Sequence, residues 1–280
     1  MAYKTISVIV TDMSADGPTL NAARDIADRE GAHLDVRCIG IDPARYEPMP
    51  AGTAIAVLEY GAAEAAEQAN KLKDWATDHL GPNLSSTSIE PVIVPQMGIE
   101  TLVARSGRYS DLIVATKPYG AGRTPLHTTV LEAELFGTAS PVLVVPEQGD
   151  LAAVPFKRIV CAWNESSESF NAIRLALPFL QAADKVDLVM VDPPTHSPER
   201  SDPGGAITIM LARHGVKAQV SILAKTMPRI SDVIARFAEE QGADLIVMGG
   251  YGHSRFRESI LGGATRDTLE NSKLPLLMAH

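Results

Sequence analysis

An internal repeat constrains the fold of this chain most strongly, because the same order of segments occurs twice within 280 residues. Such a repeat predicts two copies of one structural unit. In each copy an apolar run ends in a short polar residue, and a serine follows two residues later. The matched segments are residues 5–14 with 157–166, 18–30 with 169–181, 41–43 with 191–193, 110–116 with 243–249, and 141–145 with 275–279.

Each copy alternates apolar runs of strand length with segments of helical periodicity. Strands that alternate with helices imply right-handed crossovers and a parallel sheet covered by helices on both faces. We therefore predict an α/β fold with two tandem domains, residues 1–147 and 156–280. The predicted strands are residues 5–11, 34–41, 88–94, 111–116 and 141–145, then 158–163, 185–191, 217–223, 244–249 and 275–279; the predicted helices include 18–30, 54–80 and 169–181.

Charge and composition exclude several classes of function. A net charge of −9 argues against a nucleic-acid-binding surface, which needs a basic stripe. No apolar run approaches the roughly 18 residues of a membrane helix, and no export signal is visible, so we expect a cytoplasmic protein without a membrane partner. Cys38 and Cys161 lie in strand-like runs and have no second ligand at metal spacing. They are predicted to be buried free thiols, and no metal site is expected.

A glycine-rich stretch follows the fourth apolar run of the second copy and precedes a helical segment that ends near residue 271. Glycine lets backbone N–H groups approach a phosphate closely, and a helix N-terminus adds partial positive charge. The stretch therefore favours a phosphate site, although the same glycines could serve only tight turns and close helix–sheet packing. Its glycines are Gly249, Gly250, Gly252, Gly262 and Gly263.

The fold predicts which residues accompany these glycines. In open parallel sheets, ligands bind beyond the carboxyl ends of the strands, where the strand order reverses. Asn164 and Ser166 would then lie near the glycines, and the backbone at Val191 would edge a base. His253 and Arg255 lie inside the loop and could bond phosphate oxygens. The alternative is that Asn164 and Ser166 only cap a helix and that the loop charges form a solvated turn.

The corresponding stretch of the first copy, residues 116–129, has lost the glycine pattern. Thr116 stands where Gly249 does, and Pro118 and Pro125 stiffen the loop and remove backbone donors. We expect phosphate binding there to be weak or absent. Neither copy contains a nucleophile elbow, a Walker A loop or a zinc-protease helix, so the sequence identifies no catalytic residue.

The spacing of Gly249, Gly252 and Gly262 resembles the nucleotide motif Gly-x2-Gly-x9-Gly-Ser/Thr of the universal stress protein family. Residues 243–280 carry the likeness most strongly, and the first copy carries it faintly. The resemblance implies domains of the adenine nucleotide alpha hydrolase-like type, each with a five-stranded parallel sheet of order 3-2-1-4-5. It also implies pairing of the two domains through their fifth strands, while the sheet edges could support a homodimer.

The same resemblance implies a stress-response binding or regulatory module, and some members of the family bind ATP. Two residues depart from the pattern: Gly263 replaces the usual Ser or Thr, and Asn164 replaces the usual Asp. Losing one hydroxyl contact costs about 0.5–1.5 kcal/mol, which weakens binding roughly tenfold at most. A ligand-free interaction scaffold and a slow ATPase are the alternatives. The expected nucleotide-binding residues are Asn164, Ser166, Val191, Gly249, Gly252, His253, Arg255, Gly262 and Gly263.

Overall fold

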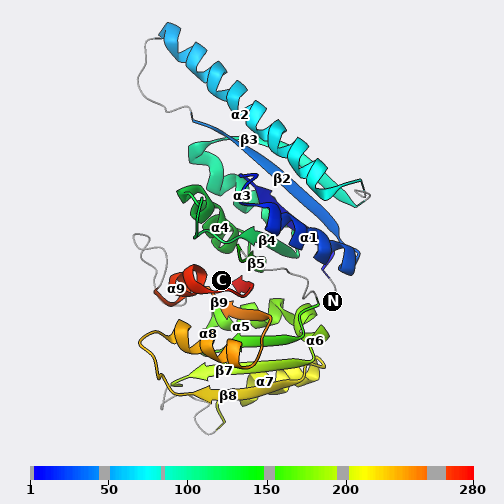
Figure 1. Ribbon diagram of the computed structural model, residues 1–280, viewed down its shortest axis with the longest axis vertical. Helices are drawn as coiled ribbons and strands as arrows, with labels where there is room; N and C mark the ends of the chain where they lie inside the picture. The colour runs from blue at the N-terminus through cyan, green and yellow to red at the C-terminus, as the bar shows by residue number, and fades with distance from the viewer. Residues whose placement is uncertain (1–2, 44–50, 83–85, 148–154, 194–201, 251–262) are drawn as a thin grey trace. The chain divides into compact units, whose positions relative to one another are not determined.

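The computed structural model describes residues 3–43, 51–82, 86–147, 155–193, 202–250 and 263–280. Chain contacts divide these residues into two compact units, Tyr3–Ser140 and Pro141–His280. Strands alternate with helices along each unit (Figure 1). The predicted α/β fold is confirmed, and each of the ten predicted strands has a counterpart whose ends agree within one residue.

In the unit Tyr3–Ser140, four parallel strands are ordered β3-β2-β1-β4. Three alternate side chains of β1 are fully buried: Ile6, Val8 and Val10. Strand residues two apart point to the same face of the sheet, and β-branched side chains pack well there. The elements are β1 Thr5–Val10, α1 Gly17–Glu30, β2 His33–Asp42, α2 Ala51–Leu80, β3 Thr87–Pro95, the 3-10 turn η1 Gln96–Gly98, α3 Ile99–Gly107, β4 Leu112–Thr116 and α4 Pro125–Gly137.

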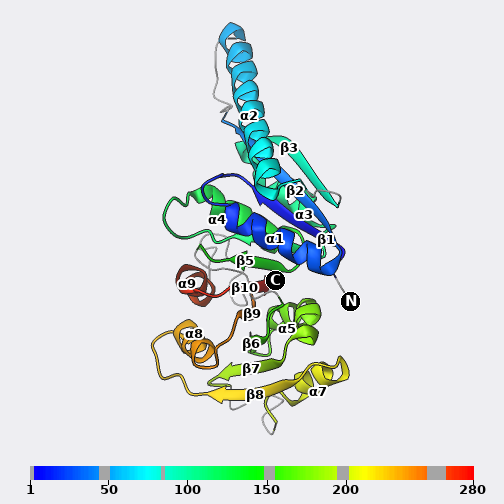
Figure 2. The ribbon, with the colours of Figure 1, turned by 45° about the vertical axis from the view of Figure 1, so that its right-hand side comes forward.

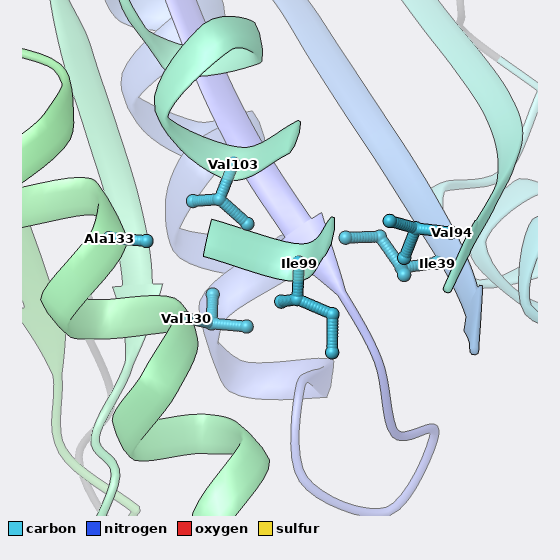
Figure 3. Close-up of a cluster of buried hydrophobic side chains, with 6 residues drawn as sticks. All are labelled: Ile39, Val94, Ile99, Val103, Val130 and Ala133. Carbon is cyan, nitrogen blue, oxygen red and sulfur yellow. The ribbon is translucent and has the colours of Figure 1, made fainter. Parts of the chain in front are cut away.

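Helices cover both faces of this sheet, as two neighbouring residues of β2 show. A Cβ atom on Gly40 would lie 1.8 Å from the carbonyl oxygen of Ala65, so only glycine admits the close approach of α2. Figures 1 and 2 both show α2 lying along β2 and β3. The adjacent Ile39 points to the opposite face. There it packs with Val94 and with side chains of α3 and α4, in the cluster that Figure 3 shows.

The unit Pro141–His280 has its strands in the order β8-β7-β6-β9-β10-β5. All neighbours are parallel except β5 and β10, which pair antiparallel with Leu277 opposite Leu143. The elements are β5 Val142–Val145, β6 Arg158–Ala162, α5 Ser167–Leu175, α6 Leu177–Ala182, β7 Lys185–Val191, α7 Gly205–Arg213, β8 Ala218–Leu223, α8 Ile230–Glu240, β9 Leu245–Gly249, α9 Gly263–Asn271 and β10 Leu276–Ala279.

One predicted helix is two helices in the structure. The segment 169–181 contains Pro178, which has no N–H to donate to the carbonyl four residues earlier. The chain therefore ends α5 at Leu175 and restarts as α6 at Leu177, with the proline in the first turn where no donor is needed. The helical periodicity continues across the break, which is why the sequence predicts a single helix.

The two cysteines are buried free thiols, as predicted. Burial raises the pKa of Cys38 to about 12 and also raises the pKa of Cys161, so neither thiol ionises near neutral pH. No helix within the described ranges combines the length and the apolar character needed to cross a membrane.

Candidate functional site

The strand order of the unit Pro141–His280 brings the predicted site residues to one edge of its sheet. Strands β6 and β9 are adjacent and parallel, with Cys161 opposite Val247. Their carboxyl ends therefore lie side by side, and these ends lead into Asn164 and Gly249. Strand β7 pairs with β6 on its other side, with Ala162 opposite Val189, so Val191 lies at the same edge.

Asn164 and Ser166 shape the turn between β6 and α5. The side-chain Oδ1 of Asn164 accepts the N–H of Ser166 at 3.2 Å, and Glu165 between them has the left-handed value φ 62°. Ser166 is the N-cap of α5, and its hydroxyl accepts the N–H of Ser169 at 3.1 Å. The capping interpretation therefore holds for Ser166. Asn164 is exposed, and its carboxamide remains accessible at the sheet edge.

Gly249 serves helix–sheet packing. A Cβ atom at this position would lie 2.6 Å from the backbone nitrogen of Ser169 and 2.7 Å from the carbonyl carbon of Glu168. Such contacts do not occur, so a larger residue would push α5 away from the end of β9. Glycine at 249 therefore positions the turn that carries Asn164.

The next residue, Gly250, is hydrogen-bonded to Ala279 and His280. Its N–H donates to the carbonyl of Ala279 at 2.8 Å, and its own carbonyl lies 3.1 Å from Nδ1 of His280. This N–H is therefore already paired and is not one of the donors that a phosphate would meet. Gly252, His253, Arg255 and Gly262 lie outside the described residues.

Gly263 is the first residue of α9 and is exposed. None of the described residues lies within 4 Å of the place that a Cβ atom would take at this position. Within the described part of the unit, no packing contact requires glycine here, and the position admits the hydroxyl that the family motif carries. The start of α9 also adds partial positive charge.

Val191 is the last residue of β7, and hydrogen bonds fix the turn that follows it. It is half-buried and stands opposite Leu223 of β8. The following Asp192 adopts the left-handed value φ 44°, donates its N–H to Leu223 and accepts the N–H of Lys225 at 3.2 Å. These hydrogen bonds fix the backbone conformation at and just after Val191, at the edge where a base would lie.

Trp163 lies at the same edge of the sheet and is not among the residues that the sequence predicts for the site. It directly precedes Asn164, is 9% exposed, and packs edge-on against Phe170 at 6.5 Å between ring centroids. Its indole N–H has no hydrogen-bond partner in the structure as described. The signal was present in the sequence, because a tryptophan closing a strand at the ligand edge carries a polar N–H as well as apolar surface.

The equivalent edge of the unit Tyr3–Ser140 is closed by a buried carboxylate. Asp16, 1% exposed, accepts the N–H groups of Thr11 and Asp12 at 2.7 and 3.0 Å. Its other oxygen accepts the hydroxyl of Thr116 at 2.6 Å, and Thr116 also bonds Thr19 at 2.8 Å. Thr116, which replaces the glycine of the second copy, therefore ties the end of β4 to the end of β1.

Asp12 in this unit stands where Asn164 stands in the other. Partial burial opposes ionisation of its carboxyl group, but hydrogen bonds from the hydroxyl and the N–H of Ser14 outweigh burial and hold its pKa below the usual value. Both of these bonds go to Oδ1, at 2.7 and 2.8 Å. Asp12 thus shapes its own turn as Asn164 does.

A small cavity of about 10 Å³, the size of a single water site, lies beside Asp16 and is also lined by Thr116, His127 and Glu134. Glu134 is 1% exposed, and its two carboxyl oxygens have no hydrogen-bond partner within the described part of this unit. Burial, and then the charge of Asp16, raise its pKa well above the usual value. Across the described residues of both units, no three His, Cys, Asp or Glu side chains are grouped so that they could hold a metal ion.

Comparison with known families matches residues 155–280 to the model described as the universal stress protein family. Residues 155–280 therefore form a universal stress protein domain. The chain is 27% identical over 138 residues to a universal stress protein of Synechocystis, an alignment that covers 49% of this chain and 46% of the relative. It is 36% identical over 45 residues to a universal stress protein of Methanocaldococcus jannaschii, covering 16% of this chain and 28% of the relative. The matched part thus spans less than half of either relative.

Solved structures extend the likeness in fold to the whole chain. A universal stress protein from Archaeoglobus fulgidus superposes with a TM-score of 0.68 at 13% identity, covering 98% of this chain and 95% of that one. A functionally unknown protein from Pseudomonas aeruginosa superposes with a TM-score of 0.58 at 16% identity, covering 99% and 92%. At these identities the likeness concerns the fold alone.

Proposed function

We propose that the whole chain is a tandem universal stress protein, with domains 1–147 and 156–280, that acts in stress adaptation as a binding or regulatory module. Its ligand is an adenine nucleotide, ATP or ADP, held at the carboxyl edge of the second domain. The observation that carries this proposal is the pairing of β6 with β9. This pairing brings Asn164 and the start of the glycine-rich stretch to one edge of the sheet, and the pairing of β7 with β6 brings Val191 to the same edge.

The described contacts divide the predicted site residues by role. Ser166 and Gly249 position the first turn of α5 against β9, so we assign them to shaping the site. Asn164 presents an exposed carboxamide, which offers both a donor and an acceptor to a ribose hydroxyl. The backbone at Val191 edges the base. Gly252, Gly262 and Gly263 hold the phosphates, with His253 and Arg255 as side-chain donors, and these five assignments rest on the spacing of the motif and the start of α9.

The proposal includes pairing of the two domains through their fifth strands. The antiparallel pair of β5 and β10 supports this part, because β5 is the fifth strand of the first repeat and β10 is that of the second. All four residues of each strand are buried, so the pair contributes apolar surface as well as hydrogen bonds.

A ligand-free interaction scaffold is the second candidate. It is favoured by Ser166 and Gly250, whose polar groups already bond within the unit, and by Gly263, which offers no hydroxyl. The two candidates differ in one property: the scaffold predicts no affinity for nucleotides, whereas the binding module predicts measurable affinity at the second domain.

Isothermal titration calorimetry of the full chain with ATP and with ADP tests the proposal. The informative variant is Gly252→Asp, which places a carboxylate where phosphates would lie. The matched control is Gly81→Asp, which adds the same charge in the first domain. Gly81 has φ 76°, a conformation that aspartate tolerates better than most residues, and no described residue lies within 4 Å of its Cβ position. We expect binding heat for the wild type and Gly81→Asp and none for Gly252→Asp. If the wild type releases no heat with either nucleotide, nucleotide binding is excluded and the ligand-free interaction scaffold becomes the preferred function.

A further inference from the structure

Helix α4 begins with a capping box in which histidine takes the place of the usual acid or amide. Thr124 is the N-cap and His127 is the third residue of the helix. The backbone N–H of Thr124 donates to Nδ1 of His127 at 3.1 Å, and the Thr124 hydroxyl lies 3.2 Å from the same nitrogen. Glutamate or glutamine normally occupies this position and accepts the N–H of the N-cap residue through a side-chain oxygen. Glutamate keeps an acceptor oxygen whether it is charged or protonated.

An imidazole nitrogen accepts only while it carries no proton. Since Nδ1 of His127 accepts the N–H of Thr124, the neutral ring must hold its proton on Nε2. His127 is 5% exposed, and Nε2 has no partner among the residues described. The ring lines the cavity that Asp16 and Glu134 also line, so this N–H is held in a pocket that contains two carboxyl groups.

Charged groups of both signs lie around the ring. Asp12, in the turn after β1, lies within electrostatic reach of His127 and of Arg123. Asp16 precedes α1, and Glu134 lies two turns further along α4. The negative charges of Asp12 and Asp16 attract a positive charge on the ring, Arg123 repels it, and the bond from Thr124 requires an unprotonated Nδ1. The start of α4 therefore has two competing arrangements, separated by one proton.

We propose that His127 is a pH-sensitive latch on the start of α4. In the neutral ring Nδ1 closes the cap with Thr124. Uptake of a proton from solvent at Nδ1 removes that acceptor, leaves the Thr124 N–H unpaired and charges the ring beside Asp16 and Glu134. Acid pH then releases the helix start and the segment 117–124 that leads into it. This role concerns the first unit and does not depend on nucleotide binding.

Hydrogen exchange of the full chain at pH 8 and pH 5, corrected for the intrinsic exchange rate, tests the latch. We expect protection of the Thr124 amide and of the first turn of α4 to fall about fivefold or more at pH 5, the size expected for the loss of one cap. His127→Gln supplies the ordinary capping-box residue, which does not titrate, and it should show no such change. The cap of α5, in which the Ser166 hydroxyl accepts the Ser169 N–H, is the internal control and should be equally protected at both pH values.

Two results would overturn the latch. One is equal protection of the Thr124 amide at both pH values in the wild type, and the other is the same loss in His127→Gln. A second measurement does not need the variant: nitrogen NMR of the histidine rings at pH 8 should show His127 with its proton on Nε2. A proton on Nδ1 at that pH would contradict the cap on which the proposal stands.

Discussion

The hydroxyl of Thr116 donates to the buried carboxylate of Asp16 at 2.6 Å, and this one bond joins the carboxyl end of β4 to the turn after β1. At the matching position of the other unit, Gly249 instead lets the backbone of α5 pack against the end of β9. The two copies therefore close the same edge of the sheet by different physical means. One uses a buried hydrogen-bond network, and the other uses the absence of a side chain.

Thr116→Val tests the network, because valine keeps the shape and removes the donor. Asp16 then keeps the bonds from Thr11 and Asp12 at Oδ2 and loses the bond that the Thr116 hydroxyl donates to Oδ1. A buried acceptor left without its partner costs about 1–3 kcal/mol. We expect the free energy of unfolding, measured in urea, to fall by about that amount. Thr101→Val, the same change at an exposed position of α3, should shift it by less than about 0.5 kcal/mol.

Gly249→Ala tests the packing at the other edge. The added Cβ would meet the backbone at Ser169 and Glu168 at 2.6–2.7 Å, so α5 has to move. Overpacking of this kind costs about 1–3 kcal/mol, which urea unfolding should detect. Gly263→Ala is the matched control, since its Cβ at the start of α9 would meet none of the described residues within 4 Å. Unchanged stability of Gly249→Ala would mean that α5 can shift freely and that Gly249 has no packing role.

The strands of this fold are predictable from the sequence because most are short apolar runs, several of them rich in β-branched residues, and the same order of segments recurs in the second copy. The details of the edges are not. Thr116 and Asp16 are 100 residues apart, and nothing local marks them as partners. The spacing of Gly249 fits a phosphate loop and close packing equally well, and only the distance to Ser169 shows the packing role. The cap formed by Thr124 and His127 also escapes recognition, because the sequence signature of a capping box is Glu or Gln at the third helical residue.

Gly263→Ser restores the hydroxyl that the family motif carries, and none of the described residues lies within 4 Å of the Cβ position to obstruct it. If the second domain binds ATP as proposed, one added hydrogen bond of about 0.5–1.5 kcal/mol should tighten binding by roughly two- to tenfold. Trp163 reports binding by fluorescence in a Trp75→Phe background, because these are the two tryptophans of the chain. Gly263→Ala adds the carbon without the oxygen and should leave the affinity near that of the parent. A gain in Gly263→Ala equal to that of Gly263→Ser would attribute the effect to the backbone instead.

Glu134 makes the stability of the chain depend on pH. Burial, and then the charge of Asp16, raise its pKa well above the ordinary 4.5, so the folded state keeps this carboxyl group protonated while the unfolded chain ionises it. The stabilising contribution is complete below pH 4.5 and is lost as pH rises towards the folded-state pKa. Glu134→Gln stays neutral at every pH, so the urea midpoint of the wild type should fall more between pH 5 and pH 8 than that of this variant. Glu64→Gln, an exposed change on α2, should follow the wild type, and a wild-type midpoint that falls no more than that of Glu134→Gln would show that Glu134 is ionised in the folded state.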